Sequence, residues 1–205
     1  MENKRVIPAS ELIINEDGSI FHLHLKPEQL ADIVILVGDP GRVALVASFF
    51  DSKECEVSSR EFNTVTGTYK GKRMTVLSTG IGTDNIDICV TELDALANID
   101  FATRQVKDEF RQLTLLRLGT SGALQPDIKV GEQVFSRTSV GFDGLLNYYA
   151  GRNEVCDLGF EQAFMEHTGW NPLLTKPYFV DADKQLFELF KDVTREGVTI
   201  AAPGF

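Results

Sequence analysis

Apolar residues fall into short runs along the first half of the chain, and several of these runs stop at a glycine. Val34–Val37 is rich in β-branched residues and ends at Gly38, which predicts a buried strand. Glu61–Tyr69 alternates partly between apolar and polar positions, and Lys70-Gly71 separates it from a second alternating run, Lys72–Thr79. This pattern predicts two strands joined by a tight turn.

Helical signals occur at three places. Asp39-Pro40 suits an N-cap and a first helical position, which predicts a short helix over Val43–Phe50. A longer helix, capped by Thr83 or Asp84, is predicted from one apolar stripe at helical spacing. The stripe consists of Ile86, Cys89, Val90, Leu93, Leu96 and Ala97. A third helix is predicted over 183–195, and its first residue suits the capping position.

The remaining apolar runs complete an alternation of strands with helices. We expect further strands at Leu113–Leu118, Val130–Phe135, Thr138–Phe142 and Val198–Ala202. Such alternation is typical of the α/β class, and we predict a mixed central β-sheet flanked by helices. The length of 205 residues suffices for one sizeable core, so a single domain over residues 1–205 is expected.

Composition narrows the classes of function. Apolar residues make up 43% and charged residues 24% of the chain, as in soluble globular proteins. The formal net charge of −10 argues against nucleic-acid binding as a main role, since that role depends on neutralising phosphates. No apolar run approaches the ~20 residues that span a bilayer, and the polar N-terminus does not resemble a signal peptide. With three scattered cysteines, we expect a cytoplasmic protein with reduced thiols and no membrane contact.

Three predicted strands run into glycine-containing turns, GDPGR, STGIGTDN and RLGTSGAL. Glycine lets backbone N–H groups approach a ligand closely, and ligands of open α/β sheets bind at the carboxyl ends of strands. No Walker loop is present, and GxGxxG is incomplete because Asn85 stands at its third glycine. Any one of these turns is more often structural, but the three together favour a site for a polyanion.

Arginines accompany these turns. Arg42 follows the first turn, and Arg117 lies two residues before Gly119 within an apolar run. A charge in such a run is costly unless it pairs with a buried carboxylate or meets a ligand, and both alternatives stay open. Arg60 is expected to begin a strand after a polar turn, and alone it would be a solvated charge. Guanidinium groups bind phosphate well because they donate two parallel hydrogen bonds.

Two histidines stand in the sequence FHLHL. On a strand, His22 and His24 would point to one face. A zinc pair would need further ligands, and no matching cluster follows, so we expect no metal. One histidine reaching a ligand hydroxyl is the better interpretation. The sequence also contains no GxSxG, no HExxH and no evident Ser/His/Asp or Cys/His set.

Taken in order, the segments FHLHL, VGDPGRV, SREFNT, STGIGTDN and RLGTSGAL resemble the nucleoside phosphorylase family, most closely its uridine phosphorylase branch. They extend from Phe21 to about Val134. The resemblance implies a pentosyltransferase of pyrimidine salvage that converts a uridine-like nucleoside and free phosphate to a base and (deoxy)ribose 1-phosphate. It implies no cofactor, with inorganic phosphate as co-substrate. Phosphorolysis passes through an oxocarbenium-like transition state, which a preorganised anion site can stabilise.

The resemblance also implies roles for individual residues. The expected phosphate ligands are Gly38, Arg42, Arg60, Arg117 and Thr120, and Arg117 and Thr120 are the expected catalytic residues. The expected nucleoside-binding residues are His22, Thr120, Ser121, Gly122 and Phe205. In the family, residues similar to Arg60 and His22 reach the site of a neighbouring subunit, so a homodimer or homohexamer with shared sites is expected.

The chain departs from the family pattern in two places. Residues 101–112 look like an insertion relative to the compact bacterial members. The family's uracil-reading Gln and Arg, and its ribose-binding Met-Glu pair, would follow Phe205 and have no counterpart here. We therefore expect the C-terminal portion to be lacking. A purine nucleoside phosphorylase and a truncated, non-catalytic nucleoside- or phosphate-binding homologue remain alternatives. A nucleosidase is disfavoured because that branch lacks the phosphate arginines.

Overall fold

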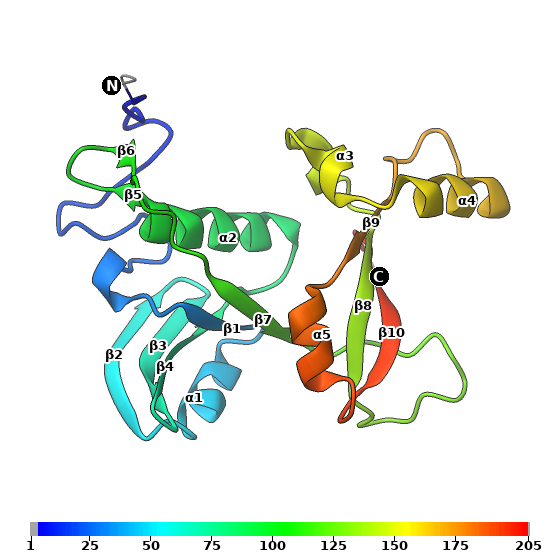
Figure 1. The fold of residues 1–205 in the computed structure, drawn as a ribbon, viewed down its shortest axis with the longest axis horizontal. Helices are drawn as coiled ribbons and strands as arrows, with labels where there is room; N and C mark the ends of the chain where they lie inside the picture. The colour runs from blue at the N-terminus through cyan, green and yellow to red at the C-terminus, as the bar shows by residue number, and fades with distance from the viewer. Residues whose placement is uncertain (1–3, 205) are drawn as a thin grey trace. The chain divides into compact units, whose positions relative to one another are not determined.

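The structure, a computed structural model, describes residues 4–204 and divides into two compact units (Figure 1). The first unit comprises residues 1–120 and the second residues 121–205. Whether the chain forms the expected single domain stays a prediction. Within the described residues, no helix is both long enough and apolar enough to cross a membrane.

A five-stranded mixed sheet forms the centre of the first unit, in the order β2-β3-β4-β1-β7. Its strands are β1 (Ile33–Val37), β2 (Ser52–Ser59), β3 (Phe62–Tyr69), β4 (Lys72–Ser78) and β7 (Thr114–Leu118). β2, β3 and β4 pair antiparallel, whereas β1 pairs parallel with both β4 and β7. The small elements η1 (Pro27–Gln29), β5 (Ile99–Asp100) and β6 (Gln105–Val106) lie outside this sheet.

One helix covers each face of this sheet (Figure 1). Alternate residues of β1 point to opposite faces, so the strand contributes to two separate cores. Val34 and Leu36 belong to the core that contains Leu93 and Leu96 of α2 (Thr83–Asn98). The other core includes Val37, Val43, Ala47, Val65 and Val76, and the helix that completes it is α1 (Gly41–Ala47). The predicted α/β fold with a mixed sheet between helices is confirmed.

The predicted elements of the first unit form with small shifts. The turn at Lys70-Gly71 joins β3 to β4 as expected. α1 ends at Ala47 rather than at Phe50. The predicted side-chain cap of α2 is wrong, because Gly82 occupies the N-cap with φ 100° and no side chain caps the helix. Strand β2 was not predicted, since its residues are mostly polar and exposed at an edge of the sheet.

The second unit contains a three-stranded sheet in the order β10-β8-β9. β8 (Val134–Gly141) pairs parallel with β10 (Arg195–Ala201) and antiparallel with β9 (Tyr178–Asp181). The helical elements are η2 (Leu145–Tyr148), α3 (Arg152–Val155), α4 (Leu158–Thr168) and α5 (Lys184–Phe190). The two strands predicted between 130 and 142 are wrong as separate elements, because Val130 is fully exposed and β8 is a single strand.

Aromatic side chains join the helices to this second sheet. Phe164 of α4 lies 5.4 Å from Phe179 of β9, between ring centroids. Phe187 of α5 lies 5.5 Å from Phe135 of β8. The predicted cap of α5 is confirmed, since the Asp183 carboxylate accepts hydrogen bonds from two backbone N–H groups of the first turn.

Candidate functional site

The three glycine-containing turns lie at one edge of the first sheet. β4, β1 and β7 run parallel, and Val37 at the end of β1 is opposite Ser78 on one side and Leu118 on the other. The backbone N–H of Thr79 donates to the Val37 carbonyl over 2.8 Å, which continues the pairing past β4. The carboxyl ends of these strands therefore meet, where open α/β sheets bind their ligands.

Arg117 lies against the first turn. A Cβ placed on Gly38 would lie 3.8 Å from Nη2 of Arg117 and 3.8 Å from the Gly80 carbonyl oxygen. A Cβ on Gly119 would collide with Nη1 of the same guanidinium. Because Gly38 and Gly119 have no side chains, their backbone stays accessible beside the Arg117 guanidinium. All three turns contribute to this one small region.

Two further polar side chains lie beside Gly80 at this edge of the sheet. It is buried and has φ 69°, a left-handed conformation that favours glycine. A side chain there would collide with the Asn85 amide and with Cγ of Glu61. Asn85 in turn donates to the Ile81 carbonyl over 3.1 Å, which holds the STGIGTDN turn closed. This contact accounts for an asparagine at the third glycine position of an incomplete GxGxxG.

The first turn is shaped by Asp39. Its Oδ1 accepts a hydrogen bond from the Gly41 backbone N–H at 2.9 Å, and its carbonyl accepts one from the Arg42 N–H at 3.0 Å. Pro40, at φ −53° and ψ −33°, already has helical geometry. The prediction of Asp39 as N-cap and Pro40 as first helical residue is wrong by one position, because Pro40 is the N-cap and the helix begins at Gly41. The Arg42 side chain, in the first turn of the helix, is half-buried.

The arginines of the chain divide into two groups. The guanidinium groups of Arg42, Arg60 and Arg117 have no hydrogen bond or ion pair within residues 4–204. Every other arginine donates to a carboxylate or a carbonyl, namely Arg5, Arg73, Arg104, Arg111, Arg137, Arg152 and Arg195. Arg117 is exposed, so the alternative of a buried ion pair at this position is wrong. The three unpaired arginines are those expected to bind phosphate.

Arg60 lies in a turn rather than at the start of a strand, which corrects the expectation for it. Ser59 pairs with Phe62, so Arg60 and Glu61 form a two-residue hairpin turn between β2 and β3. Arg60 has φ 55°, a conformation that costs about 1–2 kcal/mol for a residue with a Cβ. Its guanidinium lies 5.8 Å from the centroid of the Phe21 ring.

The FHLHL segment is also a turn, so the prediction that its histidines share one strand face is wrong. His24 has φ 53°, and Leu23 and Leu25 are fully buried. The His22 ring lies 4.7 Å from the Phe21 ring in an edge-to-face arrangement. Phe21 therefore joins His22 to Arg60 in one group.

The two groups of predicted site residues are separate. Gly38, Arg42 and Arg117 lie at the sheet edge, and His22 and Arg60 surround Phe21. Within the described part of the chain, no hydrogen bond, ion pair or ring contact joins one group to the other. The remaining site predictions are not brought together. Thr120 is exposed at the end of the first unit, Ser121 and Gly122 belong to the second unit, and Phe205 lies outside the described residues.

One polar residue of this region was missed from the sequence. Glu92 on α2 is 9% exposed, and its carboxylate accepts hydrogen bonds from His22 and Leu23. It stands three residues after Cys89, so it belongs to the buried stripe of α2. A carboxylate inside that stripe was the available signal, because a buried charge requires partners.

Cys89 on the same stripe is not a nucleophile. Burial, together with the nearby negative charges of Glu92 and Glu61, raises the pKa of its thiol to about 12. The reactive thiolate is therefore scarce at neutral pH. Among the described residues, no group of three or more His, Cys, Asp or Glu side chains is arranged to hold a metal ion.

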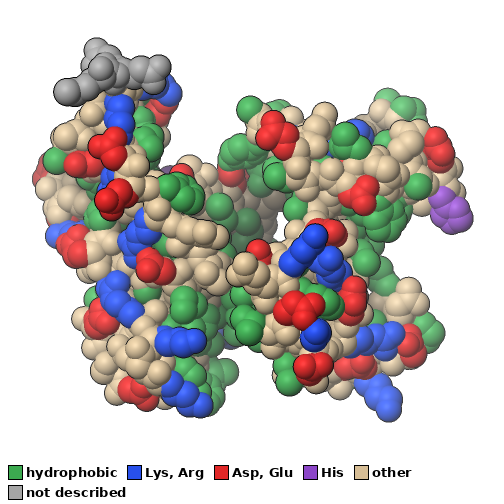
Figure 2. Space-filling model, in the orientation of Figure 1, with side chains coloured by type: hydrophobic (Ala, Val, Ile, Leu, Met, Phe, Trp, Pro, Cys, Tyr) green, Lys and Arg blue, Asp and Glu red, His purple; other side chains and the backbone are tan. Residues whose placement is uncertain are grey.

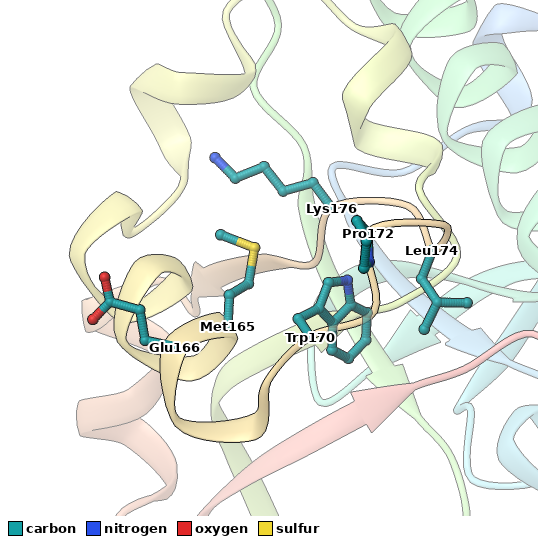
Figure 3. Close-up of a pocket in the computed structure, with 6 residues that line it drawn as sticks. All are labelled: Met165, Glu166, Trp170, Pro172, Leu174 and Lys176. Carbon is teal, nitrogen blue, oxygen red and sulfur yellow. The ribbon is translucent and has the colours of Figure 1, made fainter.

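The second unit has an open cavity of about 390 Å³ (Figure 3). Its lining residues are Met165, Glu166, Trp170, Pro172, Leu174 and Lys176. Lys176 pairs with the buried Glu161 carboxylate at 2.9 Å, and the other lining residues are mostly apolar. None of the predicted site residues that the structure describes lines this cavity.

Comparison with known proteins supports the resemblance. Residues 32–205 match the family model of the phosphorylase superfamily. The chain is similar to a uridine phosphorylase of Thermococcus kodakarensis, with 34% identity over 134 residues, which is 65% of this chain and 43% of that protein. It is also similar to a DeoD-type purine nucleoside phosphorylase of Anoxybacillus flavithermus, with 37% identity over 119 residues, which is 58% of this chain and 45% of that protein.

A solved structure is similar over nearly the whole chain. A nucleoside phosphorylase of Trypanosoma brucei that shows uridine phosphorylase activity superposes with a TM-score of 0.80 and 30% identity. The match covers 95% of this chain and 69% of that one. By contrast, the match to the two curated relatives named above covers less than half of their length.

Proposed function

Because the chain belongs to the phosphorylase superfamily, we propose that it catalyses the reversible phosphorolysis of a uridine-like pyrimidine nucleoside. A phosphate oxygen forms a bond to C1′ as the bond from C1′ to the base nitrogen breaks. The base leaves with the electron pair and takes up a proton, and (deoxy)ribose 1-phosphate remains. The observation that carries this proposal is the set of three unpaired arginines, of which Arg117 lies against the Gly38 turn.

Inorganic phosphate is the proposed ligand of the sheet edge. A guanidinium without a protein partner is available for a bidentate contact to an oxyanion. Arg117 supplies one such group beside Gly38, whose position leaves the backbone accessible. Arg42, four residues after Gly38, is proposed to supply a second. Thr120 follows Arg117 by three residues and is proposed to reach both phosphate and sugar. Holding the anion by fixed donors stabilises the positive charge that develops at C1′. No cofactor is needed for this reaction.

We propose that Arg60 and His22 act in the site of a neighbouring subunit, as in the related family members. Within the described residues, no hydrogen bond, ion pair or ring contact joins these two side chains to Gly38, Arg42 or Arg117, which supports this division. The active unit would then be a homodimer, or a homohexamer built from such dimers. A fully active monomer in sedimentation experiments would refute the shared site.

The base and the sugar are proposed to contact Thr120, Ser121, Gly122 and Phe205. The similarity to a purine nucleoside phosphorylase keeps a purine substrate as the second candidate. On the face shown in Figure 2, Lys and Arg are interspersed with Asp and Glu rather than gathered together. This distribution supports small-molecule partners rather than nucleic acid. The three free cysteines fit a reducing cytoplasmic setting.

The test is phosphate-dependent release of uracil from uridine, compared with release of hypoxanthine from inosine. We expect turnover with uridine that requires phosphate. Faster turnover of inosine would favour the purine candidate, and turnover without phosphate would contradict phosphorolysis. Measurable binding of uridine and phosphate without any turnover would identify a non-catalytic homologue.

A further inference from the structure

A buried carboxylate clamps the FHLHL turn to helix α2. The two oxygens of Glu92 accept hydrogen bonds from the backbone N–H of His22, at 3.0 and 3.1 Å, and from that of Leu23 at 2.8 Å. Oε1 also lies 2.6 Å from Nδ1 of the His22 ring. Glu92 therefore fixes both the backbone of this turn and the side chain that projects from it.

This contact determines which nitrogen of the ring has the proton. An ionised carboxylate only accepts hydrogen bonds, so Nδ1 of His22 must be the donor. A neutral ring with a proton on Nδ1 has a bare Nε2, which is an acceptor. Nε2 has no hydrogen-bond partner within residues 4–204. The edge-to-face contact with Phe21, at an interplanar angle of 76°, further restricts the ring.

His22 also lines an open cavity of about 210 Å³. Three carboxylates line the same cavity, those of Glu11, Asp87 and Glu92. Arg5 pairs with Glu11, and Arg60 lies 5.8 Å from the centroid of the Phe21 ring, so cations also lie near these carboxylates. The ligand preference therefore follows from Nε2 itself, which as an acceptor suits a donor such as a hydroxyl group. The His22 side chain is 28% exposed, so a ligand can reach the ring.

We propose that Glu92 is a positioning residue that holds His22 as the Nδ1–H tautomer and so presents Nε2 as an acceptor to a sugar hydroxyl. The ligand part of this inference rests on the proposed function, in which His22 meets the ribose 5′-hydroxyl. The inference adds a specificity: the site accepts a nucleoside and rejects a nucleoside 5′-phosphate, because Nε2 and the oxygens of an ionised phosphate are both acceptors.

The tautomer can be read directly from the full chain by nitrogen-15 NMR of the histidine rings. The chain has three histidines, so His24→Gln and His167→Gln variants assign the His22 signals. We expect a protonated Nδ1 and a bare Nε2 in the wild type. A wild-type ring protonated on Nε2, either alone or together with Nδ1, would overturn the proposal without any Glu92 variant.

Glu92→Gln tests the link to the ligand. The amide oxygen can still accept from the backbone, but the side chain no longer dictates the proton position on Nδ1, so a mixture of tautomers is expected. Uridine affinity should fall roughly threefold to tenfold, while affinity for 5′-deoxyuridine, which lacks the hydroxyl, should change by less than about twofold. Glu56→Gln, which removes an exposed carboxylate from β2, is the matched control.

The outcomes separate this inference from the proposed function. If Glu92→Gln lost affinity equally for uridine and 5′-deoxyuridine, Glu92 would have only a structural role. Tight binding of uridine 5′-monophosphate to the wild type would contradict the proposed rejection of nucleoside 5′-phosphates. If the wild type binds neither nucleoside, the proposed function fails, whereas the ring signals still decide whether Glu92 sets the tautomer.

Discussion

Arg117 and Arg152 show two opposite uses of the same side chain. Arg152 in the second unit is 9% exposed and donates to the buried Glu161 carboxylate, to two asparagine side chains and to the Pro177 carbonyl. Arg117 in the first unit is exposed and has no partner within the described residues. A buried guanidinium must be satisfied by the protein, whereas an exposed one beside open glycine backbone remains available to a ligand. The difference separates a structural cation from one that we propose to bind phosphate.

The largest expected effect is a loss of stability when Arg152, the structural arginine of this comparison, loses its carboxylate partner. Glu161 is fully buried and pairs with Arg152 at 2.7 Å and with Lys176 at 2.9 Å. Glu161→Ala would leave Arg152 buried and unpaired, and should lower the free energy of unfolding by about 3–5 kcal/mol. Urea unfolding measures this. A loss below about 1 kcal/mol would mean that the cluster is not a structural centre. Glu196→Ala, at an exposed carboxylate of β10, is the control.

Removing Arg117, the proposed phosphate ligand, should affect ligand binding strongly and stability little. Arg117→Ala should weaken phosphate binding by about tenfold to a hundredfold, because hydrogen bonds to charged groups contribute about 1.5–3 kcal/mol. Its free energy of unfolding should stay within about 0.5 kcal/mol of the wild type, since the side chain is exposed and unpaired. Calorimetric titration with phosphate and urea unfolding give the two values. Unchanged phosphate affinity would remove Arg117 from the proposed site.

The position of the guanidinium can be tested without removing it. A Cβ at Gly119 would collide with Nη1 of Arg117, so Gly119→Ala should displace the guanidinium and weaken phosphate binding by about threefold to tenfold. Gly41→Ala, where the new Cβ would lie 3.4 Å from Oδ1 of Asp39, is the control at the same sheet edge. Equal effects of both variants would indicate general disturbance of the turns rather than displacement of Arg117.

The sequence predicted those parts of the fold that local patterns determine. β1, β4 and β7 are apolar runs that end in glycine-containing turns, and their parallel arrangement places these turns together. β2 was not predicted because it is a polar edge strand. The strand predicted to begin at Val130 was wrong because this residue is apolar yet exposed. The prediction that the FHLHL histidines share a strand face was wrong for a different reason. Their turn is held by Glu92, about seventy residues away in sequence. Local periodicity does not contain such a contact.

The site shows the same limit. The sequence predicted an anion site around Gly38 and Arg117 from glycines and arginines at strand ends, which is local information. That Arg117 lies over Gly119 and lacks a carboxylate partner depends on its rotamer and on neighbouring strands. Likewise, the pairing of β2 with β3, rather than any signal at Arg60 itself, places Arg60 in a hairpin turn.

The smallest expected effect concerns stability at that hairpin. Arg60 and Lys70 both have positive φ, at 55° and 47°, and both lie in hairpin turns of the first sheet. Glycine would relieve about 1–2 kcal/mol of strain but costs about 0.5–1 kcal/mol of chain entropy, so each substitution should gain roughly 0.5 kcal/mol of stability. Arg60→Gly should nevertheless lower phosphate-dependent turnover, whereas Lys70→Gly should not. Equal turnover in the two variants would place Arg60 with the structural arginines, despite its lack of a partner.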